Sequence, residues 1–222
     1  MPEFLKAKSP SYGHWRLLVQ ALALALSLAA ASPAAARTIR LVVLGDSLTA
    51  GLGLPPGEAF PDRLQAALRA KGWDVEVINA GVSGDTAADG LARYDWAVPA
   101  DADALIVELG ANDMLRGLPP EATRKTLSAI LDKAHAAHLR TLLAGMRAPP
   151  NLGAEYDRAF DAIYPALAKA HDVALYPFFL DGVAGDPKLN QSDGMHPTAE
   201  GVEAIVKRIE PSVEGILKQV KP

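Results

Sequence analysis

The sequence of 222 residues predicts an α/β protein built on a parallel β-sheet that helices cover on both faces. Short apolar, β-branched runs alternate along the chain with longer segments of helical periodicity. The short runs are also apolar at nearly every position, rather than at every second one, which is typical of strands buried on both faces.

Five runs are predicted to form the strands of this sheet. Four of them are followed directly by a glycine or a proline, residues that commonly end a strand. The predicted strands are residues 39–44, 75–78, 104–109, 139–144 and 173–176.

Five segments with apolar residues at helical spacing are predicted to form the helices that cover the sheet. In the last of them Val202, Ile205, Val206 and Ile209 form one stripe, and Pro211 is expected to kink or restart the helix. The predicted helices are residues 60–70, 86–96, 121–137, 156–170 and 198–220.

The N-terminus has the pattern of a secretory signal. Three basic residues precede the apolar run 17–31, and Ala34-Ala35-Ala36 supplies a cleavage site before Arg37. The alternative is an uncleaved membrane anchor, but the run is shorter than the ~20 residues that span a bilayer. We therefore expect a cleaved signal peptide at residues 1–36, no stable membrane anchor, and a single domain at 37–222 that acts in the periplasm or is secreted.

Charge and cysteine content exclude several kinds of partner and site. The formal net charge is −4, and removal of three basic residues and one acidic residue with the signal leaves 19 basic and 25 acidic residues. Without a basic stripe, a nucleic-acid partner is not expected. The absence of cysteine excludes disulfides, a thiol nucleophile and a cysteine metal site.

Polar clusters follow the predicted strands, at the edge where open parallel sheets bind their ligands. A serine at such a strand end can present its hydroxyl to a substrate, although it needs a neighbouring base. Ser47 occupies this position after the first strand, and the alternative is a helix N-cap in a glycine-rich turn.

A base and its orienting acid are available late in the chain. Asp193 and His196 are three residues apart in a predicted loop, so the carboxylate can accept from one imidazole nitrogen while the other faces a serine. We predict Ser47, His196 and Asp193 as nucleophile, base and orienting acid. The alternative is an ordinary loop in which Asp193 caps a turn.

Acyl transfer also needs hydrogen-bond donors for the oxyanion. We predict three donors, namely the backbone N–H groups of Ser47 and Gly81 and the side-chain amide of Asn112. Asp46 and Asp113 each adjoin a predicted site residue, and we expect both to hold loops through backbone hydrogen bonds. Asp85-Thr86 is expected to open a helix.

Together the clusters resemble the four sequence blocks of the SGNH, or GDSL, hydrolases over essentially all of the chain after residue 36. The resemblance implies a flavodoxin-like three-layer α/β/α sandwich with a five-stranded parallel sheet. The blocks are Gly45-Asp46-Ser47-Leu48-Thr49, Asn79-Ala80-Gly81-Val82-Ser83-Gly84-Asp85-Thr86, Gly110-Ala111-Asn112-Asp113 and Asp193-Gly194-Met195-His196-Pro197.

Within this family the chain is similar to the periplasmic thioesterase I/lysophospholipase/arylesterase subgroup, whose Pro-Asn-x-Gly loop lies beside the substrate pocket. Here the loop spans residues 145–153, and the resemblance implies that Met146, Pro149 and Asn151 contact substrate. Leu152 stands where the subgroup pattern has an aromatic residue, and Ala148 where it has a larger apolar one.

The predicted activity is hydrolysis of small-molecule acyl esters and thioesters, including aryl esters and lysophospholipids, through an acyl-enzyme. It requires no metal and no cofactor, and a monomer is expected. A carbohydrate O-acetylesterase would use the same residues, and a non-catalytic binding module on this fold is the second alternative.

Overall fold

The computed structural model describes residues 37–220, which form a five-stranded, fully parallel sheet. The spatial order of the strands is β2-β1-β3-β4-β5, the flavodoxin-like order in which the connection reverses direction beside β1. The strands are β1 (Ile39–Gly45), β2 (Val75–Gly81), β3 (Ala104–Glu108), β4 (Arg140–Ala144) and β5 (Ala174–Tyr176).

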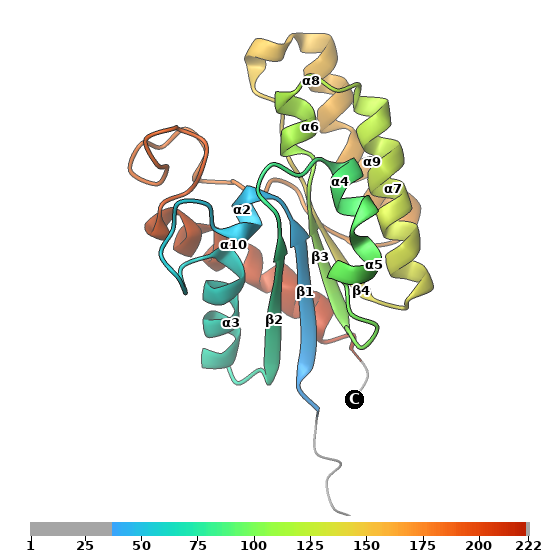
Figure 1. Ribbon diagram of the computed structural model, residues 1–222, viewed down its shortest axis with the longest axis vertical. Helices are drawn as coiled ribbons and strands as arrows, with labels where there is room; N and C mark the ends of the chain where they lie inside the picture. The colour runs from blue at the N-terminus through green and yellow to red at the C-terminus, as the bar shows by residue number, and fades with distance from the viewer. Residues whose placement is uncertain (1–36, 221–222) are drawn as a thin grey trace, which may run out of the picture. The chain divides into compact units, whose positions relative to one another are not determined.

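Helices cover both faces of this sheet, as Figure 1 shows. On one face α3 (Phe60–Ala70) packs against α10 (Ala199–Leu217), and the apolar stripe of α10 is buried. The other face carries α4 (Ala87–Ala92), α5 (Tyr94–Ala97), α7 (Pro120–Ala136) and α9 (Ile163–His171). This three-layer arrangement confirms the predicted fold class.

Shorter helical segments surround the carboxyl ends of the strands. They are α2 (Ser47–Ala50), α6 (Ala111–Leu115), the 3₁₀ turn η1 (Pro150–Leu152) and α8 (Ala154–Asp161). α2 and α6 each begin within three residues of a strand end, so their first residues lie at the edge where the polar clusters were predicted. In residues 37–220 we find no helix of the length and hydropathy that crossing a membrane requires.

The helix boundaries differ from the prediction in three places. The predicted helix 86–96 is two helices, α4 and α5, which meet at Arg93. The predicted helix 156–170 is also two, α8 and α9, because Pro165 has no N–H to bond to the carbonyl of Asp161. In contrast, α10 does not restart at Pro211; burial of apolar residues on both sides of the proline keeps the helix continuous.

Strand β2 is longer than predicted, and this difference bears on the site. The apolar run ends at Ile78, but pairing with β1 continues through Asn79 and Ala80 to Gly81, which is in register with Gly45. The strand is extended by its partner rather than by its own hydrophobicity, because backbone hydrogen bonds to β1 do not depend on side-chain type.

Candidate active site

Ser47 lies directly at the carboxyl end of β1, as the first residue of the one-turn helix α2. The turn is fixed at its start by Asp46, whose carboxylate accepts the N–H of Leu48 at 3.0 Å. It is fixed at its end by Gly51, which adopts the left-handed conformation and donates to the Ser47 carbonyl. The prediction that Asp46 holds this loop is therefore confirmed.

His196 contacts Ser47 although 149 positions separate them in the sequence. Its Nε2 lies 2.8 Å from Ser47 Oγ, and its Nδ1 lies 2.6 Å from Asp193 Oδ2. The other oxygen of Asp193 accepts the N–H groups of Met195 and His196, at 2.9 and 3.0 Å. The structure thus brings the three predicted residues into one hydrogen-bonded line.

The hydrogen bonds to Asp193 decide the protonation pattern of this line. Backbone N–H groups of His196 and Met195, and then the imidazole, lower the pKa of Asp193 to about 2. An ionised carboxylate only accepts hydrogen bonds, so Nδ1 of His196 carries the hydrogen that it donates to Asp193, and Nε2 is the ring nitrogen that faces the serine. This is the arrangement that general-base activation of a hydroxyl requires.

Gln191 fixes the loop that carries His196, a role that the sequence did not reveal. Its backbone N–H donates to the His196 carbonyl at 2.7 Å. Its side-chain amide donates to the carbonyls of Leu52, 2.8 Å away beyond α2, and Pro197, at 2.9 Å. Gln191 therefore ties the histidine loop to the segment that follows the nucleophile.

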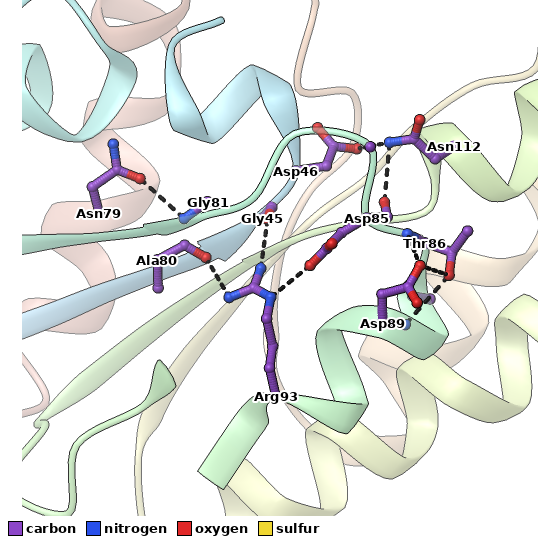
Figure 2. Close-up of polar contacts among 12 residues, drawn as sticks. Gly45, Asp46, Asn79, Ala80, Gly81, Asp85, Thr86, Asp89, Arg93 and Asn112 are labelled. Carbon is purple, nitrogen blue, oxygen red and sulfur yellow. Dashed lines mark hydrogen bonds and ion pairs between the residues drawn. The ribbon is translucent and has the colours of Figure 1, made fainter. Parts of the chain in front are cut away.

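Asn112, on the first turn of α6, points its side-chain amide toward the nucleophile loop (Figure 2). Nδ2 donates to Asp46 Oδ2 at 3.1 Å and to the Asp85 carbonyl at 3.0 Å. The neighbouring Asp113 accepts the Ala87 N–H at 2.8 Å, which confirms its predicted role in holding a loop. The amide of Asn112 is thus held between two of the loops at the site.

Gly81 does not lie where the predicted role requires. Because β2 extends to Gly81, the residue lies within the sheet, and its N–H donates to Asn79 Oδ1 at 3.0 Å (Figure 2). A side chain at Gly81 would place its Cβ 2.4 Å from the backbone nitrogen of Ala50 in α2. This glycine therefore serves the close packing of β2 against α2, and the assignment of its N–H as an oxyanion donor is wrong.

Gly84 occupies the position that was predicted for Gly81. It lines the cavity beside Ser47 and adopts a left-handed conformation with φ of 89°. Among residues 37–220, no acceptor engages its N–H. Gly84 could have been identified from the sequence, since it belongs to the same block as Gly81. Because the strand was predicted to end at Ile78, Gly81 was taken as the first glycine of the loop after it, whereas in the structure Gly81 is still part of β2.

Two buried carboxyl groups lie beneath the nucleophile. Burial raises the pKa of Asp46 to about 6. Burial, and secondly the charge of Asp46, hold the pKa of Glu108 well above its usual range. Glu108 Oε2 accepts the Thr49 hydroxyl at 2.7 Å, so this acid supports α2 from below.

A cavity of about 710 Å³ opens in front of Ser47 and His196. Met146 and Pro149, for which substrate contact was predicted, line this cavity, while Asn151 lies exposed in η1 and outside the lining. The 3₁₀ turn that starts at Pro150 carries Asn151 away from the cavity. Apolar side chains dominate the walls and include Leu48, Leu52, Met114, Leu115, Met146, Phe178, Leu180 and Met195.

No group of three or more histidine, aspartate or glutamate side chains in the described part of the chain is placed to hold a metal ion. What the arrangement offers is a hydroxyl beside an imidazole, with backbone N–H groups and an amide close by, at the mouth of an apolar cavity. This set can activate an oxygen nucleophile and stabilise negative charge on a carbonyl oxygen.

Comparison with known proteins places these features in a family. The model of the GDSL-like lipase/acylhydrolase family matches residues 43–204. The chain is 42% identical to an arylesterase of Vibrio mimicus over 183 residues, covering 81% of this chain and 88% of that protein. It is 40% identical over 184 residues to thioesterase 1/protease 1/lysophospholipase L1 of Escherichia coli K12, covering 81% and 87%.

Solved structures agree with the sequence comparison. The crystal structure of TesA superposes with a TM-score of 0.76 at 38% identity, and the match covers 80% of this chain and 99% of that one.

Proposed function

Since the chain belongs to the GDSL-like lipase/acylhydrolase family and is a carboxylic ester hydrolase, we propose that Ser47 attacks the carbonyl of acyl esters and thioesters. The observation that carries the proposal is the line from Ser47 Oγ through His196 to Asp193, with contacts of 2.8 and 2.6 Å. Aryl esters, acyl thioesters and lysophospholipids all present a carbonyl that this line can attack.

The proposed reaction has two stages. His196 Nε2 takes the hydroxyl proton as Ser47 Oγ bonds to the carbonyl carbon, and the carbonyl oxygen becomes an oxyanion. The N–H groups of Ser47 and Gly84 stabilise that charge. Asn112 Nδ2 joins them when one of its two hydrogens turns from Asp46 or Asp85 to the oxyanion. His196 then gives its proton to the leaving alkoxide or thiolate, and an acyl-enzyme remains.

Water completes the cycle in the same site. His196 removes a proton from water as its oxygen attacks the acyl carbon, and the collapsing intermediate expels Ser47, which regains the proton. Asp193 stays ionised throughout and stabilises the charged imidazole. Every step uses groups of this chain, without a metal or a cofactor.

The cavity supports fatty acyl chains as substrates rather than acetyl groups. An acetyl group would fill a small part of about 710 Å³, and most of the wall is apolar. A series of p-nitrophenyl esters from C2 to C16 separates the two candidates. Preference for C6 or longer chains supports the proposal, and highest kcat/KM for acetate would favour the carbohydrate O-acetylesterase.

The decisive experiment is Ser47→Ala, assayed on p-nitrophenyl butyrate and by labelling with a fluorophosphonate probe. Ser128 provides a matched control, because its hydroxyl lies 2.9 Å from Nε2 of His171 but stands in the middle of α7. Ser47→Ala should abolish hydrolysis and labelling, whereas Ser128→Ala should leave both unchanged. Substantial activity in Ser47→Ala would contradict the proposal.

We also propose that residues 1–36, which lie outside the described residues, are a cleaved export signal, and that domain 37–222 acts in the periplasm as a monomer. The support is the basic start, apolar run and alanine-rich end of this segment. Expression in a bacterial host, fractionation and mass measurement should give a periplasmic chain that begins at Arg37. Light scattering should give the mass of one chain.

A further inference from the structure

Arg93 is a buried arginine in the junction between α4 and α5, with only 6% of its surface exposed. Its guanidinium lies beneath the carboxyl ends of two neighbouring strands (Figure 2). Arginine is seldom buried unless its charge and its donors are paired. The partners of Arg93 therefore indicate why it occupies this position.

Three separate groups accept hydrogen bonds from this one guanidinium. Nη2 donates to the Gly45 carbonyl at 2.8 Å, and Nη1 donates to the Ala80 carbonyl at 2.8 Å. Nε donates to Asp85 Oδ2 at 2.5 Å and forms an ion pair in which 8% of the Arg93 side chain and 13% of the Asp85 side chain are exposed. Arg93 thus joins the end of β1, the end of β2 and the loop that follows β2.

Two of these contacts, those to Gly45 and Asp85, are close to a proposed oxyanion donor. Gly45 lies two residues before Ser47, and Asp85 directly follows Gly84. The carbonyl of Asp85 accepts Nδ2 of Asn112 at 3.0 Å, so the third donor is bound to the same residue. A single side chain is therefore connected to all three donors without contacting the cavity, whose lining does not include Arg93.

We propose that Arg93 is a positioning residue for the hydrolysis reaction, which sets the spacing of the Ser47, Gly84 and Asn112 donors by clamping the loops after β1 and β2 together. This inference rests on the proposed function. The planar fork of arginine matches three acceptors in fixed directions, whereas the single ammonium of lysine cannot reach all of them. Oxyanion stabilisation depends on donors that are already in place before charge develops.

The alternative is that these contacts of Arg93 stabilise the folded state without affecting the rate of the folded enzyme. The chain contains a control for this possibility in Arg40, at the opposite end of β1. Its guanidinium also joins β1 to β2, through Glu76 at 3.1 Å, and it pairs with Asp101. Arg40 therefore resembles Arg93 as a link between strands, but it lies away from the cavity.

The test compares Arg93→Lys with Arg40→Lys on p-nitrophenyl butyrate, with rates expressed per folded molecule. Arg93→Lys should lower kcat at least about tenfold, part of the 10²–10³ that one lost oxyanion donor costs. Its KM should change less than about threefold, because the change acts on the transition state. Arg40→Lys should keep the wild-type kcat. Equal kcat per folded molecule for the two variants would overturn the proposal.

Asp85→Asn provides a second variant, because it breaks the same ion pair. If Arg93→Lys is too unstable to assay, kcat per folded molecule of Asp85→Asn is compared with that of Arg40→Lys instead.

A double variant with Asn112→Ala provides a measurement that a loss of stability does not affect. If Arg93 acts through the donors, the effects of Arg93→Lys and Asn112→Ala on kcat should be less than multiplicative. Multiplicative effects would contradict the proposal. An inactive Ser47→Ala alongside a fully active Arg93→Lys would reject the clamp and keep the proposed function.

Discussion

Glu108, the last residue of β3, is predicted to be a neutral acid that holds the nucleophile turn. It is completely buried, and its Oε1 has no hydrogen-bond partner among the described residues. Its Oε2 accepts the hydroxyl of Thr49, the third residue of α2, at 2.7 Å. Burial, followed by the negative charge of Asp46, raises the pKa of Glu108 well above its ordinary value of 4.5.

The substitution Glu108→Gln removes the titration and keeps the shape. Above pH 4.5 the unfolded wild type loses this proton while the folded wild type retains it. The native state then binds one more proton at this site, so the contribution of Glu108 to wild-type stability falls with rising pH by about 1.4 kcal/mol per unit until the folded pKa is reached. Glutamine lacks this slope and can still accept from Thr49.

At pH 5 the free energy of unfolding of Glu108→Gln should therefore lie within about 1 kcal/mol of the wild-type value. At pH 6, 7 and 8 the variant should become progressively more stable relative to wild type. Glu108→Ala is the contrasting variant, because it leaves a cavity and an unpaired Thr49 hydroxyl. It should lose about 2–4 kcal/mol at pH 5. Urea unfolding at each pH measures both effects. A constant difference between Glu108→Gln and wild type across this range would refute the neutral-acid argument.

Three further predictions concern the catalytic line and the cavity. Asp193→Asn should lower kcat by about 10³–10⁴, because an amide does not select the Nδ1–H form of His196. Since the pKa of Asp193 is about 2, the carboxylate stays ionised between pH 8 and pH 5, and the difference in kcat between wild type and Asp193→Asn should persist over this range. Loss of that difference at pH 5 would contradict an ionised Asp193. Gly84→Ala should cost about 1–2 kcal/mol in urea unfolding, because φ is 89°, and should lower kcat; an unchanged kcat would remove Gly84 from the donors. Met146→Trp should fill part of the cavity and raise KM for C12 esters more than for C4 esters; equal changes would place the acyl chain elsewhere.

The sequence predicted the sheet and the catalytic line because both leave local patterns. Each strand is an apolar run, and Asp193 and His196 lie three residues apart, so their contact depends on a single loop. Ser47 could be identified because parallel strands bring their carboxyl ends to one edge. These inferences require only the order of elements along the chain.

The errors arose where a partner far away in the sequence decides the local structure. The end of β2 is set by its pairing with β1, which the polar and small residues Asn79, Ala80 and Gly81 do not reveal. Arg93 is a charged residue in a predicted helix, a pattern that ordinarily indicates a solvent-exposed position. Its burial depends on the carbonyls of Gly45 and Ala80, which belong to two different strands.

The loop between β2 and α4 shows why the site requires so many buried charges. Gly84 has no side chain through which the fold could anchor it, and its left-handed backbone is not fixed by a hydrogen bond to its N–H. Its carbonyl accepts Nη2 of Arg116 at 2.6 Å, and the residues that follow it are held as well: Asp85 by Arg93 and Asn112, and the Ala87 N–H by Asp113. An N–H that must be free to bind an oxyanion cannot also hold its own loop in place. The anchoring therefore falls to the carbonyl of Gly84 and to the residues that follow it. Ion pairs and charged hydrogen-bond partners provide stronger and more directional contacts there than neutral groups.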